Sequence, residues 1–414
     1  MKCRHCGLEL QQSFLDLGHA PPSNAYLTAT NLKEPEVWFP LRLMVCENCH
    51  LVQTEDYAGR EALFTDDYAY FSSFSSSWLD HAKNYVVEMI KRFGLTSQSI
   101  VVEVAANDGY LLQYVKSFGI ACYGIEPTAS TAKAARAKGI DIVDQFFGVG
   151  LADSLVAQNL HADLITANNV LAHVPDINDF VSGFSRLLKQ NGVATFEFPH
   201  LLSLVRKNQF DTVYHEHYSY LSLTSVQKIF ATNGLTIFDV EELPTHGGSL
   251  RVFAQRTDTR KFTTELSVNA FLEKEKKEGI TTKDFYNDFQ QHAETVKNNV
   301  LAFLIDAKRQ GKMVAGYGAA AKANTLFNFA GVRPDLVLYI VDKNPAKQNR
   351  FMPGSHIPIV DEAHLKRNKP DYILILPWNI KVEVIEQLAY AQDWGAKFVV
   401  AVPNLQITSF DHFC

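Results

Sequence analysis

The sequence predicts an α/β protein built from a small cysteine-rich unit followed by two doubly wound, Rossmann-like parallel sheets. Four cysteines near the start form two CxxC pairs, at Cys3/Cys6 and Cys46/Cys49. Beyond them, short apolar strands alternate with helical stretches twice along the chain, which indicates two parallel sheets. The expected domain limits are 1–68, 69–252 and 253–414.

Composition and charge narrow the class of protein. The 414 residues are 47% hydrophobic and 20% charged, with a net charge of -6, which argues against long disorder and against a nucleic-acid or anionic-membrane partner. The first residues lack the apolar core of a signal peptide, and no apolar run is long enough to span a bilayer. We therefore expect a cytoplasmic protein without membrane or nucleic-acid partners, and a monomer.

The two CxxC pairs indicate a metal site. In a chain without a secretion signal, such pairs are better explained by metal than by disulfides. Two CxxC turns supply four thiolates, which complete a tetrahedral zinc site with no open position. His5, His19 and His50 are alternative ligands, and a catalytic metal is the alternative role. We expect structural zinc on Cys3, Cys6, Cys46 and Cys49, with strands at 14–18 and 41–45 beside it.

The middle of the chain predicts a cofactor-binding sheet. A helix over about Trp78 to Phe93 precedes four strands, predicted at residues 100–104, 121–125, 162–166 and 193–198. Ligands of such sheets bind beyond the carboxyl ends of the strands, and Glu126 at the end of the second strand suits two ribose hydroxyls. The loop before Gly109 has only one glycine, so it does not identify the ligand by itself. The candidate cofactor-binding residues are Glu103, Ala105, Asn107, Gly109, Glu126 and Asn168.

The segment from Tyr214 to Tyr220 contains two histidines, one glutamate and three tyrosines in seven residues. So many groups that exchange or donate protons indicate a catalytic segment. An extended chain would place Tyr214 and Glu216 on one face, whereas a helix would arrange them differently, and both remain open. A buried polar network or a metal site is the alternative. His173, after the third strand, should lie near the same crevice.

The last part of the chain predicts a second nucleotide-binding unit. Residues 261–307 are charged and helical, and they should bridge two domains. A strand then leads into Gly316-Tyr317-Gly318-Ala319-Ala320-Ala321, which satisfies G-x-G-x-x-A. Further strands are predicted at residues 336–341, 372–376 and 398–402. Gly316 and Gly318 would let the backbone approach a phosphate, Lys322 would add charge, and Asp342 would accept from a ribose.

The full order of motifs resembles the sugar C-methyltransferases that act on TDP-linked deoxy sugars. The matching features are the four-cysteine knuckle, Val101 to Tyr110, Tyr214-His215-Glu216-His217, His246 to Val252 and Gly316-Tyr317-Gly318-Ala319. The resemblance implies that the middle domain binds S-adenosylmethionine and that the C-terminal domain, with His246, helps to hold a nucleotide-linked keto sugar. It implies functional roles for Tyr68, His173, Tyr214, Glu216 and His217, with His217 as the base.

The chemistry agrees with these residues. A carbon beside a ketone must lose a proton before it can attack a methyl group, and a neutral histidine is suited to removing it. Tyrosines can donate to the enolate oxygen. Two other classes remain open, an NAD-dependent sugar oxidoreductase that uses the Gly316 loop and a zinc-bearing interaction protein.

Overall fold

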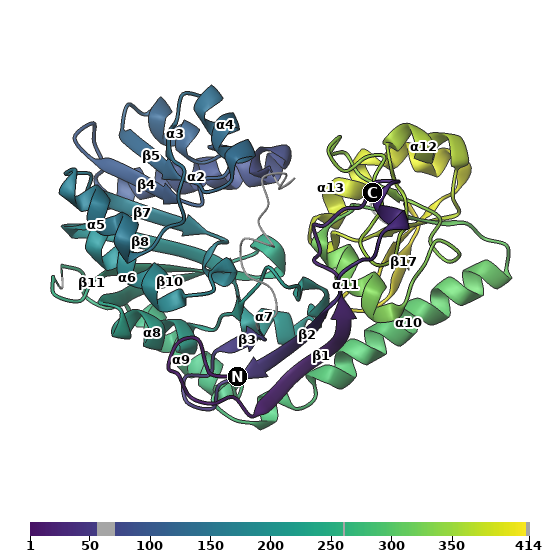
Figure 1. Cartoon of the computed structure of the whole chain (residues 1–414), viewed down its shortest axis with the longest axis horizontal. Coiled ribbons are helices and arrows are strands. Elements are labelled where there is room, and N and C mark those ends of the chain that lie inside the picture. Colours follow the sequence, from purple (N-terminus) through teal and green to yellow (C-terminus); the bar gives the residue numbers. More distant parts are fainter. Residues whose placement is uncertain (56–70, 260, 411–414) are drawn as a thin grey trace.

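The computed structural model describes residues 1–55, 71–259 and 261–410. Within these residues, three sheets form, and the expected α/β class with a cysteine-rich N-terminal unit is confirmed. Figure 1 shows the central sheet and the C-terminal sheet as two lobes, with the long helix α10 (Phe289–Arg309) running along the base of the molecule.

The N-terminal sheet combines strands from two distant parts of the chain. Its order is β1-β2-β3-β9, with β1 at Gln12–Ala20, β2 at Phe39–Val45, β3 at Val52–Thr54 and β9 at Ser219–Tyr220. The two predicted strands at 14–18 and 41–45 lie within β1 and β2, which pair antiparallel. Strand β9 forms the end of the histidine-rich segment, which runs from Tyr214 to Tyr220. The cysteine-rich unit and the candidate catalytic segment therefore share one sheet.

The central sheet has the strand order β10-β11-β8-β7-β4-β5-β6. Its bounds are β4 Ile100–Val104, β5 Ala121–Ile125, β6 Asp141–Val143, β7 Ala162–Asn168, β8 Leu188–Pro199, β10 Leu235–Leu243 and β11 Ser249–Arg256. Strands β8 to β6 run parallel, as predicted, whereas β10 and β11 add an antiparallel edge. The expected domain limit after residue 252 falls inside β11, so the central sheet continues to Arg256.

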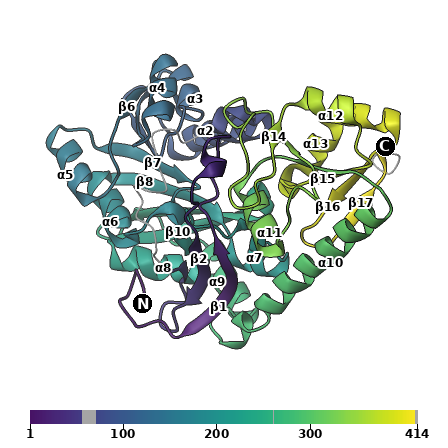
Figure 2. The same ribbon diagram turned by 45° about the vertical axis from the view of Figure 1, so that its right-hand side comes forward.

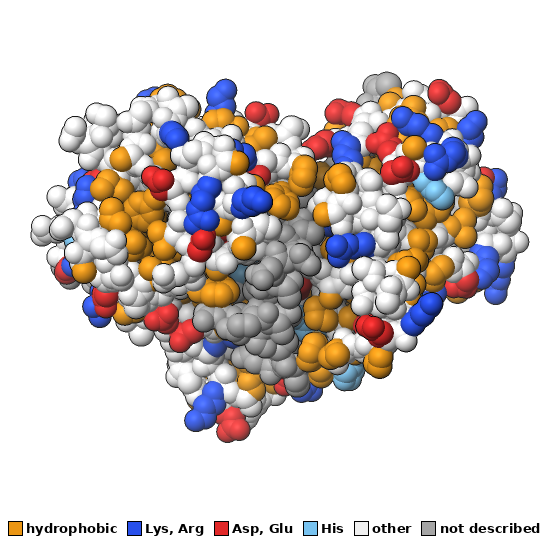
Figure 3. All heavy atoms as spheres, turned by 45° about the horizontal axis from the view of Figure 1, so that its top comes forward, with side chains coloured by type: hydrophobic (Ala, Val, Ile, Leu, Met, Phe, Trp, Pro, Cys, Tyr) orange, Lys and Arg blue, Asp and Glu red, His pale blue; other side chains and the backbone are white. Residues whose placement is uncertain are grey.

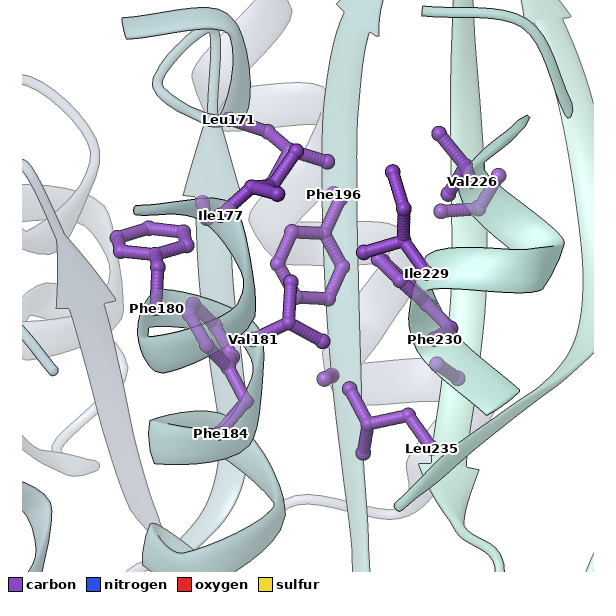
Figure 4. Close-up of a cluster of buried hydrophobic side chains, with 14 of the residues drawn as sticks. Leu171, Ile177, Phe180, Val181, Phe184, Phe196, Val226, Ile229, Phe230 and Leu235 are labelled. Atoms are coloured by element: carbon purple, nitrogen blue, oxygen red, sulfur yellow. The ribbon is translucent and has the colours of Figure 1, made fainter. Parts of the chain in front are cut away.

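Helices cover both faces of this sheet (Figure 2). They are α2 Ser76–Phe93, α3 Leu112–Ser117, α4 Ala129–Ala137, α5 Val149–Ala157, α6 Ile177–Leu187, α7 Leu201–Arg206 and α8 Leu223–Thr232. Figure 4 shows side chains of α6 and α8 packed around Phe196 of β8. Leu171 belongs to the same fully buried cluster. Because Leu171 lies two residues before His173, this core fixes the loop that carries a candidate catalytic histidine.

The C-terminal sheet has the order β14-β13-β12-β15-β16-β17. Its strands are β12 Val314–Tyr317, β13 Ile340–Val341, β14 Ile359–Val360, β15 Tyr372–Ile375, β16 Lys397–Val400 and β17 Gln406–Thr408. The strand predicted at residues 336–341 is shorter in the structure. Leu336 and Val337 both donate to the Arg333 carbonyl, which makes a turn, and only Ile340–Val341 is strand.

The remaining helices are α9 Leu266–Lys277, α10, α11 Ala321–Ala330, α12 Glu362–Asn368 and α13 Lys381–Gln387. Helices α9 and α10 form the predicted helical bridge between the two lobes (Figure 1). Among the described helices, none has the length and apolar character needed to cross a membrane. On the face shown in Figure 3, the described acidic and basic side chains are interspersed.

Candidate active site and metal centre

A cavity of about 420 Å³ lies between the central and C-terminal sheets. Its wall includes the ends of strands β4, β5 and β7, residues Tyr214 and His217 of the histidine-rich segment, and the start of α11. Its volume is within the range of small-molecule sites. Of the sequence-predicted site residues, nine line it: Ala105, Asn107, Glu126, Asn168, His173, Tyr214, His217, His246 and Lys322.

The central-sheet wall fits the ribose of a nucleoside. Ala105 and Asn107 have positive φ angles of 58° and 49°, so the chain after β4 turns sharply and exposes backbone to the cavity. The Glu126 carboxylate accepts from the backbone N–H of Asn107 at 2.9 Å and from that of Thr128 at 2.9 Å. These two bonds fix the carboxylate at the cavity wall and leave lone pairs for two hydroxyl donors. The residues therefore suit S-adenosylmethionine.

Two predicted cofactor residues lie behind this wall rather than in it. A Cβ on Gly109 would contact Ile140 at 3.2 Å and Ala135 at 3.3 Å, so this glycine lets the loop pack closely at a φ of 74°. Glu103 is buried within the end of β4, and burial raises its pKa well above the usual value. Both residues support the loop without lining the cavity. Asn168, at the end of β7, is in the wall.

His217 occupies the centre of the predicted catalytic segment. From Tyr214 to His217 the segment is neither extended nor helical, because the His217 N–H donates to the Tyr214 carbonyl at 3.0 Å and closes a turn, whereas Ser219–Tyr220 is strand β9. His217 Nδ1 lies 3.1 Å from the Thr212 carbonyl, which can only accept, so Nδ1 carries the proton of the neutral ring. Nε2 therefore accepts from the Tyr214 hydroxyl at 2.8 Å. Burial, together with His173, lowers the His217 pKa well below its usual value.

Two further catalytic candidates, His173 and Glu216, lie next to His217. The rings of His173 and His217 are 4.5 Å apart, and His173 Nδ1 donates to the Glu216 carbonyl at 2.8 Å. Burial lowers the pKa of His173 to about 4, so both histidines are neutral near pH 7. Glu216 does not line the cavity itself, but its carboxylate accepts from Asn24, which does, at 3.1 Å, and burial raises the pKa of Glu216. Tyr68 lies outside the described residues.

The C-terminal wall of the cavity is the beginning of α11. Ala320, Ala321 and Lys322 line it, and no side chain caps this helix, so no capping side chain occupies its first backbone N–H groups. Lys322 Nζ lies 4.3 Å from the centre of the Trp378 ring and donates to Asn379 Oδ1. Burial lowers its pKa to about 8. A helix N-terminus with a lysine suits the oxygens of a phosphate group.

Three predicted substrate residues do not line the cavity. A Cβ on Gly316 would meet Ile340 at 3.0 Å, and one on Gly318 would meet Pro377 at 2.5 Å. Neighbouring side chains therefore already fill the space beside both glycines. Asp342 accepts from the backbone N–H of Ala319 and of Asn344, each at 2.8 Å. The acidic group expected to bind an NAD ribose therefore holds the glycine loop itself.

Sequence reasoning missed several cavity residues. Trp78 lines the wall and packs against His246 with ring centres 5.1 Å apart, and His246 Nε2 accepts from Asn169 at 3.0 Å. Lys347, from the loop after β13, also reaches the cavity. These residues lie on separate elements whose relative placement no local motif signals. The histidine-rich composition pointed to one side of the cavity only.

The four knuckle cysteines converge on one point. Their sulfurs all lie within 4.8 Å of one another, and Cys3–Cys49 and Cys6–Cys46 are each 3.5 Å apart. A tetrahedral zinc with Zn–S bonds of about 2.3 Å separates its sulfurs by about 3.8 Å. The donor set therefore fits zinc with all four positions filled by protein.

Three protein families match consecutive parts of the chain. Residues 3–64 match a zinc binding domain, residues 78–240 a methyltransferase domain, and residues 244–403 the C-methyltransferase C-terminal domain. The chain is 30% identical over 408 residues to C-methyltransferase NovU of Streptomyces niveus, covering 99% of this chain and 97% of the relative.

Solved structures with partial likeness include two methyltransferases. One is the SAM-bound magnesium protoporphyrin IX methyltransferase of Synechocystis, with 16% identity, 43% of this chain and 79% of that chain covered, and a TM-score of 0.34. The other is an S-adenosylmethionine-dependent methyltransferase of Clostridium acetobutylicum, with 12% identity, 43% and 92% covered, and a TM-score of 0.34.

The full-length relative and the three matched domains agree with the predicted order of zinc unit, cofactor sheet and C-terminal sheet. The structure adds a cavity whose wall suits S-adenosylmethionine and a cysteine cluster that suits structural zinc. The closed Gly318 loop does not favour the oxidoreductase alternative. The chain therefore belongs to the zinc-containing C-methyltransferase family and is an S-adenosylmethionine-dependent methyltransferase.

Proposed function

We propose that the protein methylates a carbon beside the carbonyl of a nucleotide-linked keto-deoxysugar. The proposed nucleotide is dTDP and the proposed position is C-3′, as the resemblance to sugar C-methyltransferases implies. The observation that carries the proposal is the neutral His217 imidazole in the wall of the shared cavity, with Nε2 as its basic nitrogen. A base is needed because a carbon beside a ketone becomes nucleophilic only after losing a proton.

In the proposed reaction, His217 Nε2 removes the proton, and the C–H electron pair forms the enolate. The substrate carbonyl oxygen replaces Nε2 as the acceptor of the Tyr214 hydroxyl, which frees Nε2 and stabilises the enolate oxygen. His173 remains neutral beside the resulting imidazolium, because its pKa is about 4. A second positive charge beside His217 is thereby avoided.

The protein must also align the reacting carbon with the methyl donor. S-adenosylmethionine supplies a methyl group that its sulfonium already activates. Glu126 would hold the ribose, and the backbone at Ala105 and Asn107, with Asn168, would complete that side of the cavity. Fixing both ligands in one cavity converts the transfer into an effectively unimolecular step.

The substrate's diphosphate would bind at the start of α11. The uncapped backbone N–H groups there and the Lys322 ammonium offer donors and positive charge on the wall opposite Glu126's strand. His246, which is neutral and held by Asn169, lies between the two walls and would contact the sugar. Gly316, Gly318 and Asp342 would act indirectly by shaping the loop that presents α11.

The proposal is tested by incubating the enzyme and S-adenosylmethionine with a panel of keto-sugar nucleotides and analysing the products by mass spectrometry. A dTDP-linked keto-deoxysugar should gain the mass of one methylene group, and NMR of the product should place the new methyl on C-3′. Methylation of only non-sugar acceptors, or of a sugar oxygen, would contradict the proposal.

A further inference from the structure

Arg4 lies in the middle of the zinc knuckle, between the ligands Cys3 and Cys6, and its side chain leaves the knuckle. Its Nη1 donates to the Pro175 carbonyl at 3.0 Å, and its Nη2 donates to the Thr54 carbonyl at 3.0 Å. The guanidinium also lies 5.2 Å from the centre of the Tyr218 ring. One side chain of the knuckle therefore joins two segments that are far apart in sequence.

The two carbonyls belong to the segments that hold the paired histidines. Pro175 follows the turn Leu171–His173, and Thr54 ends β3, which pairs with β9. The Thr54 hydroxyl donates to the His217 carbonyl at 3.3 Å, and its backbone N–H donates to the Tyr218 carbonyl at 3.2 Å. Arg4 thus donates hydrogen bonds to one segment beside His173 and to a second segment that is bonded to His217.

These two segments are also bonded to each other. The Tyr218 N–H donates to the Ala172 carbonyl at 2.8 Å, and His173 Nδ1 donates to the Glu216 carbonyl at 2.8 Å. Residues 171–175 and 216–218 are therefore joined by these two hydrogen bonds, and Arg4 adds a further hydrogen bond to Pro175 at the end of the first segment. Arg4 therefore adds a link to two segments that already contact each other.

The backbone of the knuckle around Arg4 is also held by hydrogen bonds. The Arg4 N–H donates to Gln53 Oε1 at 2.9 Å, and Gln53 Nε2 donates to Cys3 Sγ at 3.4 Å. The neighbouring His5 Nδ1 donates to Asn178 Oδ1 at 2.8 Å, and Asn178 Nδ2 donates to the His5 carbonyl at 2.8 Å. The knuckle is thereby docked onto the start of α6, two residues beyond the His173 segment.

We propose that Arg4 is a positioning residue, through which the zinc knuckle sets the relative placement of His173 and His217. The proposal rests on the proposed roles of these histidines in proton removal. It gives the metal site a function beyond folding, since the cysteines fix Arg4 and Arg4 fixes the histidine pair. Arginine is required because its planar fork reaches two carbonyls at once, whereas a lysine ammonium is a single point of charge.

The test compares Arg4→Met and Arg4→Lys with Lys2→Met, an exposed control on the same knuckle. Bound zinc, S-adenosylhomocysteine affinity, kcat, KM and the histidine ring NMR signals are measured for each variant. Arg4→Met should keep one zinc per chain and its S-adenosylhomocysteine affinity, while kcat falls about 10- to 100-fold, the effect of a displacement of about 1 Å. Arg4→Lys should fall between the wild type and Arg4→Met, and Lys2→Met should match the wild type.

The NMR signals separate this proposal from the proposed function. Signals assigned to His173 and His217 should shift in Arg4→Met and not in Lys2→Met, in the absence of any sugar nucleotide. If they shift while the wild type methylates no keto sugar, the proposed function is wrong and the positioning role stands. Unchanged histidine signals and unchanged kcat in Arg4→Met would overturn the positioning role. Should Arg4→Met fail to fold, Arg4→Lys with wild-type signals and kcat would overturn it as well.

Discussion

The two large sheets carry similar sequence patterns but use them in opposite ways. In the central sheet, the acidic residue after the second strand, Glu126, lines the cavity and is held there by two backbone N–H groups. In the C-terminal sheet, the corresponding Asp342 also accepts from two backbone N–H groups, those of Ala319 and Asn344, but it does not line the cavity. Only the first carboxylate can therefore meet a ribose bound in the cavity. A strand, a glycine turn and an acidic residue therefore predict a nucleotide-like fold without predicting a nucleotide site.

The difference extends to the glycines. A Cβ on Gly318 would lie 2.5 Å from Pro377, so the space that a phosphate would need at this turn is filled by the protein's own proline. The part of the C-terminal unit that lines the cavity is instead the beginning of α11, three residues after Gly318, where Lys322 lies. The proposed diphosphate site therefore lies at the start of the helix and not at the glycine loop.

The largest expected effect concerns the unit that supports both sheets. Cys46→Ser should lose zinc and lower the melting temperature, because structural zinc contributes apparent binding free energies of roughly 10–16 kcal/mol in small zinc-finger peptides. Metal analysis and calorimetry measure both. A zinc-free variant that melted like the wild type would contradict the structural role of the metal.

Removal of His217, the proposed base in the cavity between the two sheets, should have the next largest effect. His217→Ala should lower turnover by about 10²–10⁴-fold, the usual loss for a general base. S-adenosylhomocysteine and sugar-nucleotide binding should persist, because Glu126 and Lys322 are unchanged. Steady-state kinetics and calorimetry check the two parts of this prediction. Loss of both ligands would mean that His217 organises the cavity instead.

The comparison of Glu126 with Asp342 is tested by matched alanine variants. Glu126→Ala should weaken S-adenosylhomocysteine binding by roughly 1.5–3 kcal/mol, since it removes a charged hydrogen-bond partner. Asp342→Ala should leave that affinity unchanged and lower the melting temperature, because it releases the loop at Ala319. Equal losses of affinity in the two variants would break the comparison, as would NAD binding that depends on Asp342.

The smallest predicted effect is a fall in kcat/KM at high pH, caused by deprotonation of Lys322. Its pKa is lowered to about 8, so the ammonium that attracts a diphosphate is lost as the pH rises through that value. The kcat/KM for the sugar nucleotide should therefore fall up to about tenfold per pH unit above pH 8. Lys322→Arg should remove this fall because arginine stays charged, whereas Lys366→Arg on exposed α12 should keep it. A fall unaffected by Lys322→Arg would belong to another group.

Much of the central unit could be predicted because strand ends and apolar runs are local features. The strands at 100–104 and 121–125 have the predicted bounds, and Glu126 follows β5 as expected. The side-chain partners could not be predicted in the same way. Whether Asp342 meets a ligand or the Ala319 N–H depends on the path of a distant loop, which the period of a strand does not encode.

The histidine-rich segment shows the same limit. Its composition pointed to proton chemistry, yet both regular geometries considered for it were wrong, because a turn at Tyr214–His217 makes the local bond. That turn is held by β9 pairing with β3, about 165 residues earlier in the chain. Trp78 and Lys347 were missed for the same reason, since only the packing of the two sheets brings them to the cavity.

The proposed removal by His217 of a proton beside the sugar carbonyl can be tested by solvent exchange, without methyl transfer. With S-adenosylhomocysteine bound and D₂O as solvent, the wild type should incorporate deuterium at the carbon alpha to the ketone. His217→Ala should incorporate none above background, while His215→Ala, whose Nε2 faces the Pro40 carbonyl outside the cavity, should still exchange. Exchange at the wild-type rate in His217→Ala would contradict the account.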